Sequence, residues 1–181
     1  MISNFGNTLL FFNSLLGISI IYFSFGELKN SRITINKRIY QLCLLQITFV
    51  IISFLTLITA FVISDFSIIT VYQNSHSLKP LLYKISGTWG NHEGSLLLWV
   101  IILTTFSFFF LLYSKHHQKN YRIISLIIQN ILILGFLFFL IFNSNPFSII
   151  APTPREGLGL NPILQDPALA IHPPLLYVGF V

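Results

Sequence analysis

The chain has 181 residues, of which 54% are hydrophobic and only 8% are charged, and its mean hydropathy is +0.79. A soluble domain carries about 25% charged residues, so this composition excludes an ordinary water-soluble fold and predicts an integral membrane protein. The net charge of +5 could indicate a nucleic-acid partner, but the basic residues flank apolar segments, so we expect no nucleic acid.

Long apolar runs predict membrane-spanning helices. Such a helix needs about 20 mostly apolar residues, because the hydrocarbon layer is about 30 Å thick and a helix rises about 1.5 Å per residue. Four runs meet this requirement and a fifth begins near the end of the sequence: 5–25, 39–63, 95–113, 123–142 and 175–181. The sequence therefore predicts an all-α, polytopic transmembrane protein, with a single membrane domain over residues 1–181. No basic segment precedes the first run, so we expect an uncleaved helix there.

The basic residues predict which side of the membrane each loop faces. Seven of the ten Lys and Arg residues lie within segments 26–38 and 114–122: Lys29, Arg32, Lys37, Arg38, Lys115, Lys119 and Arg122. Positively charged loops stay in the cytoplasm, or in the matrix for a mitochondrial protein. The outer loops 64–94 and 143–172 are then expected to face the periplasm or the intermembrane space.

The two outer loops differ in composition. In the first, residues 77–85 mix Lys with Leu and Tyr, which predicts a short helix in the membrane interface with its Lys side chains reaching water. Seven of the eight Pro residues lie between 146 and 174, five in the second loop and two directly after it, which predicts fixed turns rather than a flexible linker. Loops of this length in a compact membrane protein are usually binding or docking surfaces.

The first outer loop ends in "GTWGNHEGSLLLW" (87–99), which runs into the third span. His92 and Glu93 are ionisable groups at the edge of an apolar run, and such groups are usually paired or functional. The alternative is an anchor, in which Trp89 lies among lipid headgroups and Ser95 or Glu93 caps the third span.

His172 lies in "LAIHPPLLY", directly before the fifth run. We expect Pro173 and Pro174 to keep it out of the middle of a helix and to place it at the outer end of the fifth span. A neutral imidazole there could bind a metal or a haem iron, and a structural role is the alternative. One His cannot fill both axial positions of a low-spin haem, so a second ligand would be needed.

The other candidate groups indicate structural or solvated roles. His76 lies in a polar loop, and His116 and His117 belong to a basic segment. Cys43 is the only cysteine, so the chain cannot form an internal disulfide or a CxxC centre. The sequence has no P-loop, GxGxxG, GxSxG or HExxH motif, so we assign no catalytic residue.

Two segments together resemble a known family. "GTWGNHEGSLLLW" (87–99) and "LNPILQDPALAIHPPLLYVGFV" (160–181) resemble, in the same order, two blocks of the CcmF/NrfE-type cytochrome c haem lyases of the system I maturation pathway. The resemblance covers roughly residues 80–181, and the first two spans match only in hydropathy. In that family, haem is held at the outer membrane face and is attached to apocytochrome c by thioether bonds.

The resemblance implies roles for individual residues. His172 matches the first of two outer-loop His residues that bind the haem iron in the family, so we expect it to be an axial ligand of haem b. It would orient the haem so that vinyl groups and thiols meet. Trp89, His92 and Glu93 belong to the other block, whose role the resemblance does not assign, and we expect them near the haem or a partner surface.

The family's Trp-rich haem segment and second axial His are not among the matched residues. The resemblance therefore implies the N-terminal portion of a lyase, or one piece of a split lyase that is not a complete enzyme alone. Haem would be shared with the polypeptide that carries the Trp-rich segment. A CcmE-type haem chaperone, CcmH/CcmI-type subunits, apocytochrome c and membrane lipid are the other implied partners. The possibility of a split lyase and the composition rich in Phe and Ile favour a location of this protein in the mitochondrial inner membrane. The bacterial inner membrane is the alternative location.

A second class of function stays open. The chain could be a non-catalytic scaffold subunit of a respiratory or cytochrome-maturation assembly, because it contains no complete active site. A transporter or channel is disfavoured, since the four complete runs contain no charged residue to line an ion path.

Overall fold

The computed structural model describes residues 1–30 and 34–180, so Arg32 of the predicted basic loop and Val181 of the predicted fifth span lie outside the described residues. Within this part of the chain, the long helices are α1 (Ile2–Leu28), α2 (Lys37–Val62), α5 (His92–Tyr113) and α6 (Lys119–Phe142). The short helices are α3 (Ile69–Asn74), α4 (Leu81–Gly87), α7 (Pro167–Phe180), and the 3₁₀ turns η1 (Ser114–His116) and η2 (Pro162–Gln165).

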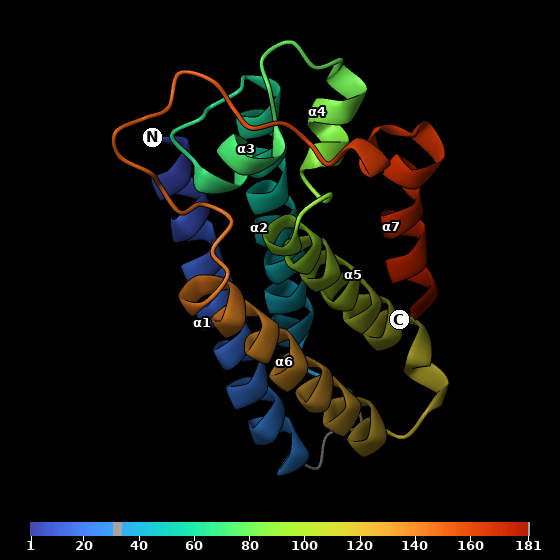
Figure 1. The fold of residues 1–181 in the computed structure, drawn as a ribbon. Helices are drawn as coiled ribbons and strands as arrows, with labels where there is room; N and C mark the ends of the chain where they lie inside the picture. Colours follow the sequence, from blue (N-terminus) through green and yellow to red (C-terminus); the bar gives the residue numbers. More distant parts are fainter. Residues whose placement is uncertain (31–33, 181) are drawn as a thin grey trace.

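The four long helices form a bundle (Figure 1). Helices α1 and α5 each pack against both α2 and α6. Each of the four is long and apolar enough to cross a membrane, and α7 is a shorter apolar helix. The predicted all-α, polytopic fold with four spans and the start of a fifth is therefore confirmed, whereas the single membrane domain stays a prediction.

Small and polar side chains bring the long helices together in the interior. A Cβ added at Gly17 would lie 2.9 Å from Leu134 Cδ2 and 3.2 Å from Gln46 Nε2, so α1 approaches α2 and α6 closely there. The fully buried Asn13 amide lies 2.9 Å from both the Gln46 carbonyl oxygen and the Val50 backbone nitrogen. Because lipid is as apolar as Leu, such close packing and polar contacts are what join helices in a membrane.

The basic end of the bundle, which carries residues 29–30, 34–36 and 114–118, contains a buried ion pair and buried hydrogen bonds. Lys119 Nζ lies 3.1 Å from Glu27 Oε2, and both side chains are about nine-tenths buried. Arg122 donates from Nε to Ser114 Oγ at 3.0 Å, and from one terminal nitrogen to Tyr40 Oη at 3.0 Å and the Leu111 carbonyl at 2.6 Å. Lys119 and Arg122, which the sequence predicted to lie in a basic loop, therefore also join helices through their side chains.

The opposite end, called the loop end, carries residues 63–91 and 143–166. Its two loops are joined by main-chain hydrogen bonds: Ile69 N to Ser148 O, Ile150 N to Ser67 O, Leu158 N to Tyr72 O and Gly159 N to Ser75 O, at 2.8–3.0 Å. The second loop crosses over the end of the bundle before it reaches α7 (Figure 1). Turns at Pro146 and Pro162, closed by Ser148 N to Asn145 O at 3.2 Å and Leu164 N to Asn161 O at 2.9 Å, are of the kind that the Pro-rich composition predicted.

The interfacial helix expected at 77–85 is displaced. Helix α4 begins at Leu81, because a residue before proline is disfavoured in helical conformation and Pro80 follows Lys79. Lys84 is half-buried and donates to Ser64 Oγ at 2.7 Å, a protein partner that the expectation of Lys side chains reaching water did not include. The helix is part of the packed loop end, in contact with α2.

The expectation that Pro173 and Pro174 keep His172 out of the middle of a helix was wrong. Helix α7 begins at Pro167 and continues through both prolines to Phe180, so His172 lies within it. Asp166 accepts from Ala168 N at 2.8 Å and Leu169 N at 3.2 Å, which starts the helix before the prolines are reached. A proline inside a membrane helix is tolerated where another donor satisfies the freed carbonyl.

Candidate functional site

The first turn of α5 packs so closely against the α4–α5 turn that Gly94 cannot be replaced by a larger residue. A Cβ added at Gly94 would lie 1.6 Å from the Thr88 carbonyl oxygen. Asn91 caps α5, since its side chain accepts from Gly94 N at 2.7 Å and its backbone is extended. The alternative in which Ser95 or Glu93 caps this span was therefore wrong. Ser95 Oγ instead donates to the Trp89 carbonyl at 2.6 Å.

Trp89 connects this turn to two helices. Its indole Nε1 donates to the Ala170 carbonyl of α7 at 2.7 Å. Its ring is stacked on Phe54 of α2, with centroids 6.4 Å apart and an interplanar angle of 20°. The half-buried Trp89 side chain therefore has defined protein partners. The alternative that placed Trp89 among lipid headgroups did not include these contacts.

His172 lies on an exposed face of α7. Residues three, four and seven positions further on lie on the same side of a helix, and here they are Leu175, Leu176 and Gly179. Leu175 is 67% exposed, and no described atom lies within 4 Å of a Cβ built at Gly179. The face therefore presents an accessible imidazole beside apolar and small residues, which fits the flat, apolar ring of a haem.

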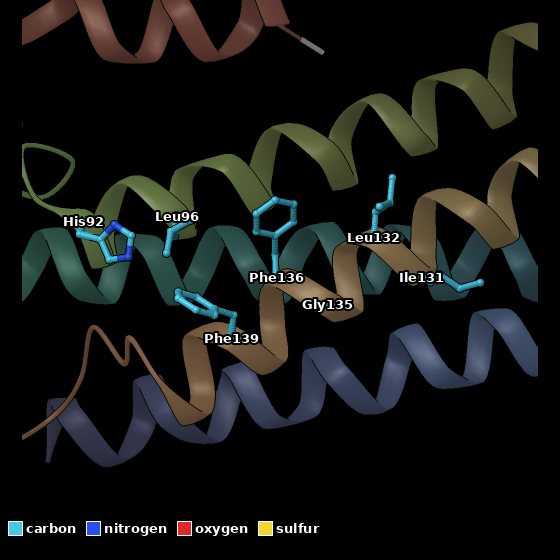
Figure 2. A pocket seen from close by; sticks show the side chains of 7 residues that line it. All are labelled: His92, Leu96, Ile131, Leu132, Gly135, Phe136 and Phe139. Carbon is cyan, nitrogen blue, oxygen red and sulfur yellow. The ribbon is translucent and has the colours of Figure 1, made fainter.

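His92 and Glu93 lie in the first turn of α5. The His92 ring is edge-on to Phe139 of α6, with centroids 6.1 Å apart. It stands at one end of an apolar groove of about 520 Å³ between α5 and α6, which is also lined by Leu96, Ile131, Leu132, Gly135, Phe136 and Phe139 (Figure 2). Glu93 is half-buried, and its charge is favourable near the positive end of the helix dipole.

The predicted site residues are thus only partly brought together. Trp89 contacts the helix that carries His172, whereas His92 faces α6. Within the described residues, no group of three or more His, Cys, Asp or Glu could hold a metal ion. In the described part of α7, His172 is the one His residue, and its imidazole is exposed.

Sequence reasoning missed two features of the loop end. The Glu156 carboxylate accepts from Ser77 N at 2.8 Å and Ser77 Oγ at 2.5 Å, and these hydrogen bonds lower the pKa of Glu156 to about 2. No local pattern indicates this contact, because its partners are 79 residues apart. Asp166 was missed as a helix cap, although an Asp directly before a Pro is an available start signal.

Comparison with known proteins gives consistent matches. The family model described as cytochrome C assembly protein matches residues 89–181. The cytochrome c-type biogenesis protein CycK of Rhizobium meliloti is 50% identical over 139 residues, which is 77% of this chain and 20% of that protein. CcmF of Escherichia coli is 45% identical over 130 residues, covering 71% of this chain and 20% of that protein.

The matches extend to a third kind of relative and to a solved structure. NrfE of Haemophilus influenzae is 41% identical over 122 residues, covering 67% of this chain and 19% of that protein. A structure described as Cytochrome c Heme Lyase CcmF has a TM-score of 0.71 at 21% identity and covers 99% of this chain and 27% of that chain, which supports the fold. The chain thus spans about a fifth of the length of these curated relatives.

Proposed function

This chain belongs to the cytochrome C assembly protein family, as a CcmF/NrfE-type N-terminal portion, and we propose that it helps to hold haem for thioether attachment to apocytochrome c. Membership confirms the resemblance that the two sequence blocks carried. The observation that carries the proposal is the uncovered face of α7, where His172 stands beside Leu175, Leu176 and Gly179.

Each side chain on this face has a separate task in the proposal. The His172 imidazole would hold the iron through a ring nitrogen, and the adjacent Leu side chains would pack against the apolar ring. Both interactions would restrict the orientation of the ring, which helps the reacting carbon to meet the incoming thiol. The haem supplies the vinyl groups to which the thiols add. His172 acts as an orienting ligand and not as a base.

The proposed site lies at the outer face of an inner membrane. The spanning helices and the bacterial relatives support an inner-membrane protein, and these relatives give no support to the expected mitochondrial location. In the bacterial setting that we propose, the basic end faces the cytoplasm and the loop end faces the periplasm, where c-type cytochromes mature.

The proposed haem is haem b, shared with the part of the lyase that carries the Trp-rich segment. A CcmE-type chaperone would deliver it, and CcmH/CcmI-type subunits would present apocytochrome c. The fraction of the relatives' length that this chain covers supports such sharing, since four-fifths of each relative lies outside the match. His92 and Glu93 are proposed to contact haem or a partner rather than to ligate iron.

The test uses the assembled lyase with the full chain. We expect His172→Ala to remove most of the low-spin haem absorbance and to lower the yield of cytochrome c, because one axial nitrogen is lost. Added imidazole should restore part of the absorbance by occupying the vacated position. His117→Ala, which changes an exposed His at the basic end, is the matched control and should leave both readouts unchanged.

Two results would contradict the proposal. An unaltered haem spectrum together with an unaltered cytochrome c yield in His172→Ala would exclude this residue as a ligand. A purified assembly without haem, and cytochrome c that still matures after deletion of the chain, would instead support a non-catalytic scaffold.

A further inference from the structure

Helix α7 has a gap in its hydrogen bonding where His172 lies. In an α-helix each N–H donates to the carbonyl four residues earlier, and proline has no N–H. Pro174 therefore leaves the Ala170 carbonyl without its helical donor. Ala170 is only 3% exposed, so bulk water has little access to that residue. His172 stands at the centre of the turn that this missing bond would have closed.

Trp89 supplies the missing donor. Its indole Nε1 lies 2.7 Å from the Ala170 carbonyl oxygen, which is a normal hydrogen-bond length. The donor comes from a residue 81 positions away and from a different part of the bundle. The bond thus does two things at once: it satisfies a buried carbonyl, and it ties the His172 turn to the α4–α5 turn.

The indole is itself held in place from three sides. The indole ring is stacked on Phe54, and the backbone carbonyl of Trp89 accepts from Ser95 Oγ at 2.6 Å. The neighbouring Gly90 brings the turn against the segment before α7, since a Cβ added there would lie 3.1 Å from Leu160 Cδ1. A donor that is fixed in this way can set the position of its acceptor.

We infer that Trp89 is a positioning residue for His172, and that its indole N–H replaces the backbone donor that Pro174 lacks. The part of this inference that concerns iron rests on the proposed function. Trp89 touches neither iron nor reacting atoms in this role. It fixes the helical turn, and the turn fixes the direction of the imidazole, so the two sequence blocks form one structural unit.

The two Trp residues contact α7 in different ways. Trp99 also packs against α7, with its ring centroid 5.1 Å from that of Tyr177 and 6.4 Å from that of Phe180. These are ring contacts, whereas Trp89 donates a hydrogen bond to a carbonyl. Replacement by Phe removes the indole donor from each position but keeps an aromatic ring, so Trp99→Phe is the matched control.

The experiment compares Trp89→Phe, Trp99→Phe and Pro174→Ala with the double variant Trp89→Phe/Pro174→Ala. An Ala at 174 restores the backbone N–H that can bond to the Ala170 carbonyl. The first readout is amide hydrogen exchange of His172, Leu175 and Leu176 in the full chain without haem. Loss of one net hydrogen bond should speed exchange about fivefold to tenfold in Trp89→Phe, and the double variant should return to the wild-type rate.

The second readout is the low-spin haem spectrum of the assembled lyase at matched protein amounts. We expect Trp89→Phe to lower it, Trp99→Phe to leave it unchanged, and Pro174→Ala to restore it in the double variant. A general loss of folding in Trp89→Phe would not be reversed by an added N–H at position 174. The double variant therefore tests the inference even if Trp89→Phe folds poorly.

The outcomes distinguish this inference from the proposed function. If Trp89→Phe exchanges like the wild type, or if the double variant remains as fast as Trp89→Phe, the inference is overturned. If these exchange results hold but His172→Ala leaves the haem spectrum unchanged, the proposed function fails and with it the role of Trp89 towards iron.

Discussion

At the scale of single residues, the first turn of α5 tolerates no side chain at Gly94, because it packs against the α4–α5 turn. A Cβ there would lie 1.6 Å from Thr88 O, a backbone atom that cannot rotate away. We expect Gly94→Ala to destabilise the protein by about 1–3 kcal/mol or more, as overpacking does, measured as a lower midpoint of thermal unfolding in detergent. Gly135→Ala is the control, because its Cβ meets no described atom within 4 Å and Ala favours a helix. Equal midpoints for the two variants would contradict this reasoning.

The contact of Glu156 with Ser77 predicts a pH dependence. Its hydrogen bonds lower the pKa of Glu156 from 4.5 to about 2, so its stabilising effect is complete above pH 4.5 and is lost as the pH falls towards 2. We expect Glu156→Gln to unfold at a lower temperature than the wild type at pH 6, and the difference to shrink as the pH falls from 4.5 to 3. A difference that stays constant over this range would show that the ionised carboxylate is not the cause.

At the scale of elements, the sequence predicted where helices exist better than where they end. Hydropathy over about 20 residues locates a membrane helix, because burial in lipid depends on the whole run. The ends depend on single groups such as Asn91, which caps α5, and Asp166, which caps α7. The path of α7 through its prolines could not be predicted, because the donor for Ala170 comes from another helix–turn segment.

The start of α6 is held by Arg122, whose side chain is buried and donates to groups on α2, α5 and η1. We expect Arg122→Ala to destabilise the bundle by about 1.5–3 kcal/mol, since acceptors of a charged donor are left unsatisfied. Lys115→Ala removes the same charge from an exposed position at the same end and should have little effect on thermal unfolding. Equal losses of stability would indicate that net charge, and not the buried contacts, is responsible.

At the scale of the whole molecule, the charge distribution predicts the orientation in the membrane. Cys43 is the only cysteine, so a Cys43→Ala background allows single-site labelling. We expect Thr153→Cys at the loop end to react with a membrane-impermeant maleimide in intact spheroplasts, and Gln118→Cys at the basic end to react only after permeabilisation. Both positions are exposed, so burial does not confound the comparison. The opposite pattern would invert the predicted topology.

The sequence by itself determined the membrane class, the four spans and the two blocks that identify the family, because composition and motifs are properties of neighbouring residues. The tertiary structure decided which groups meet: Trp89 with Ala170, 81 positions apart, and Arg122 with Tyr40, 82 positions apart. The first of these pairings supplies the donor that Pro174 lacks in α7, the helix that carries His172. A hydrogen bond between distant segments depends on how the helices pack, and no local pattern in the chain records that packing.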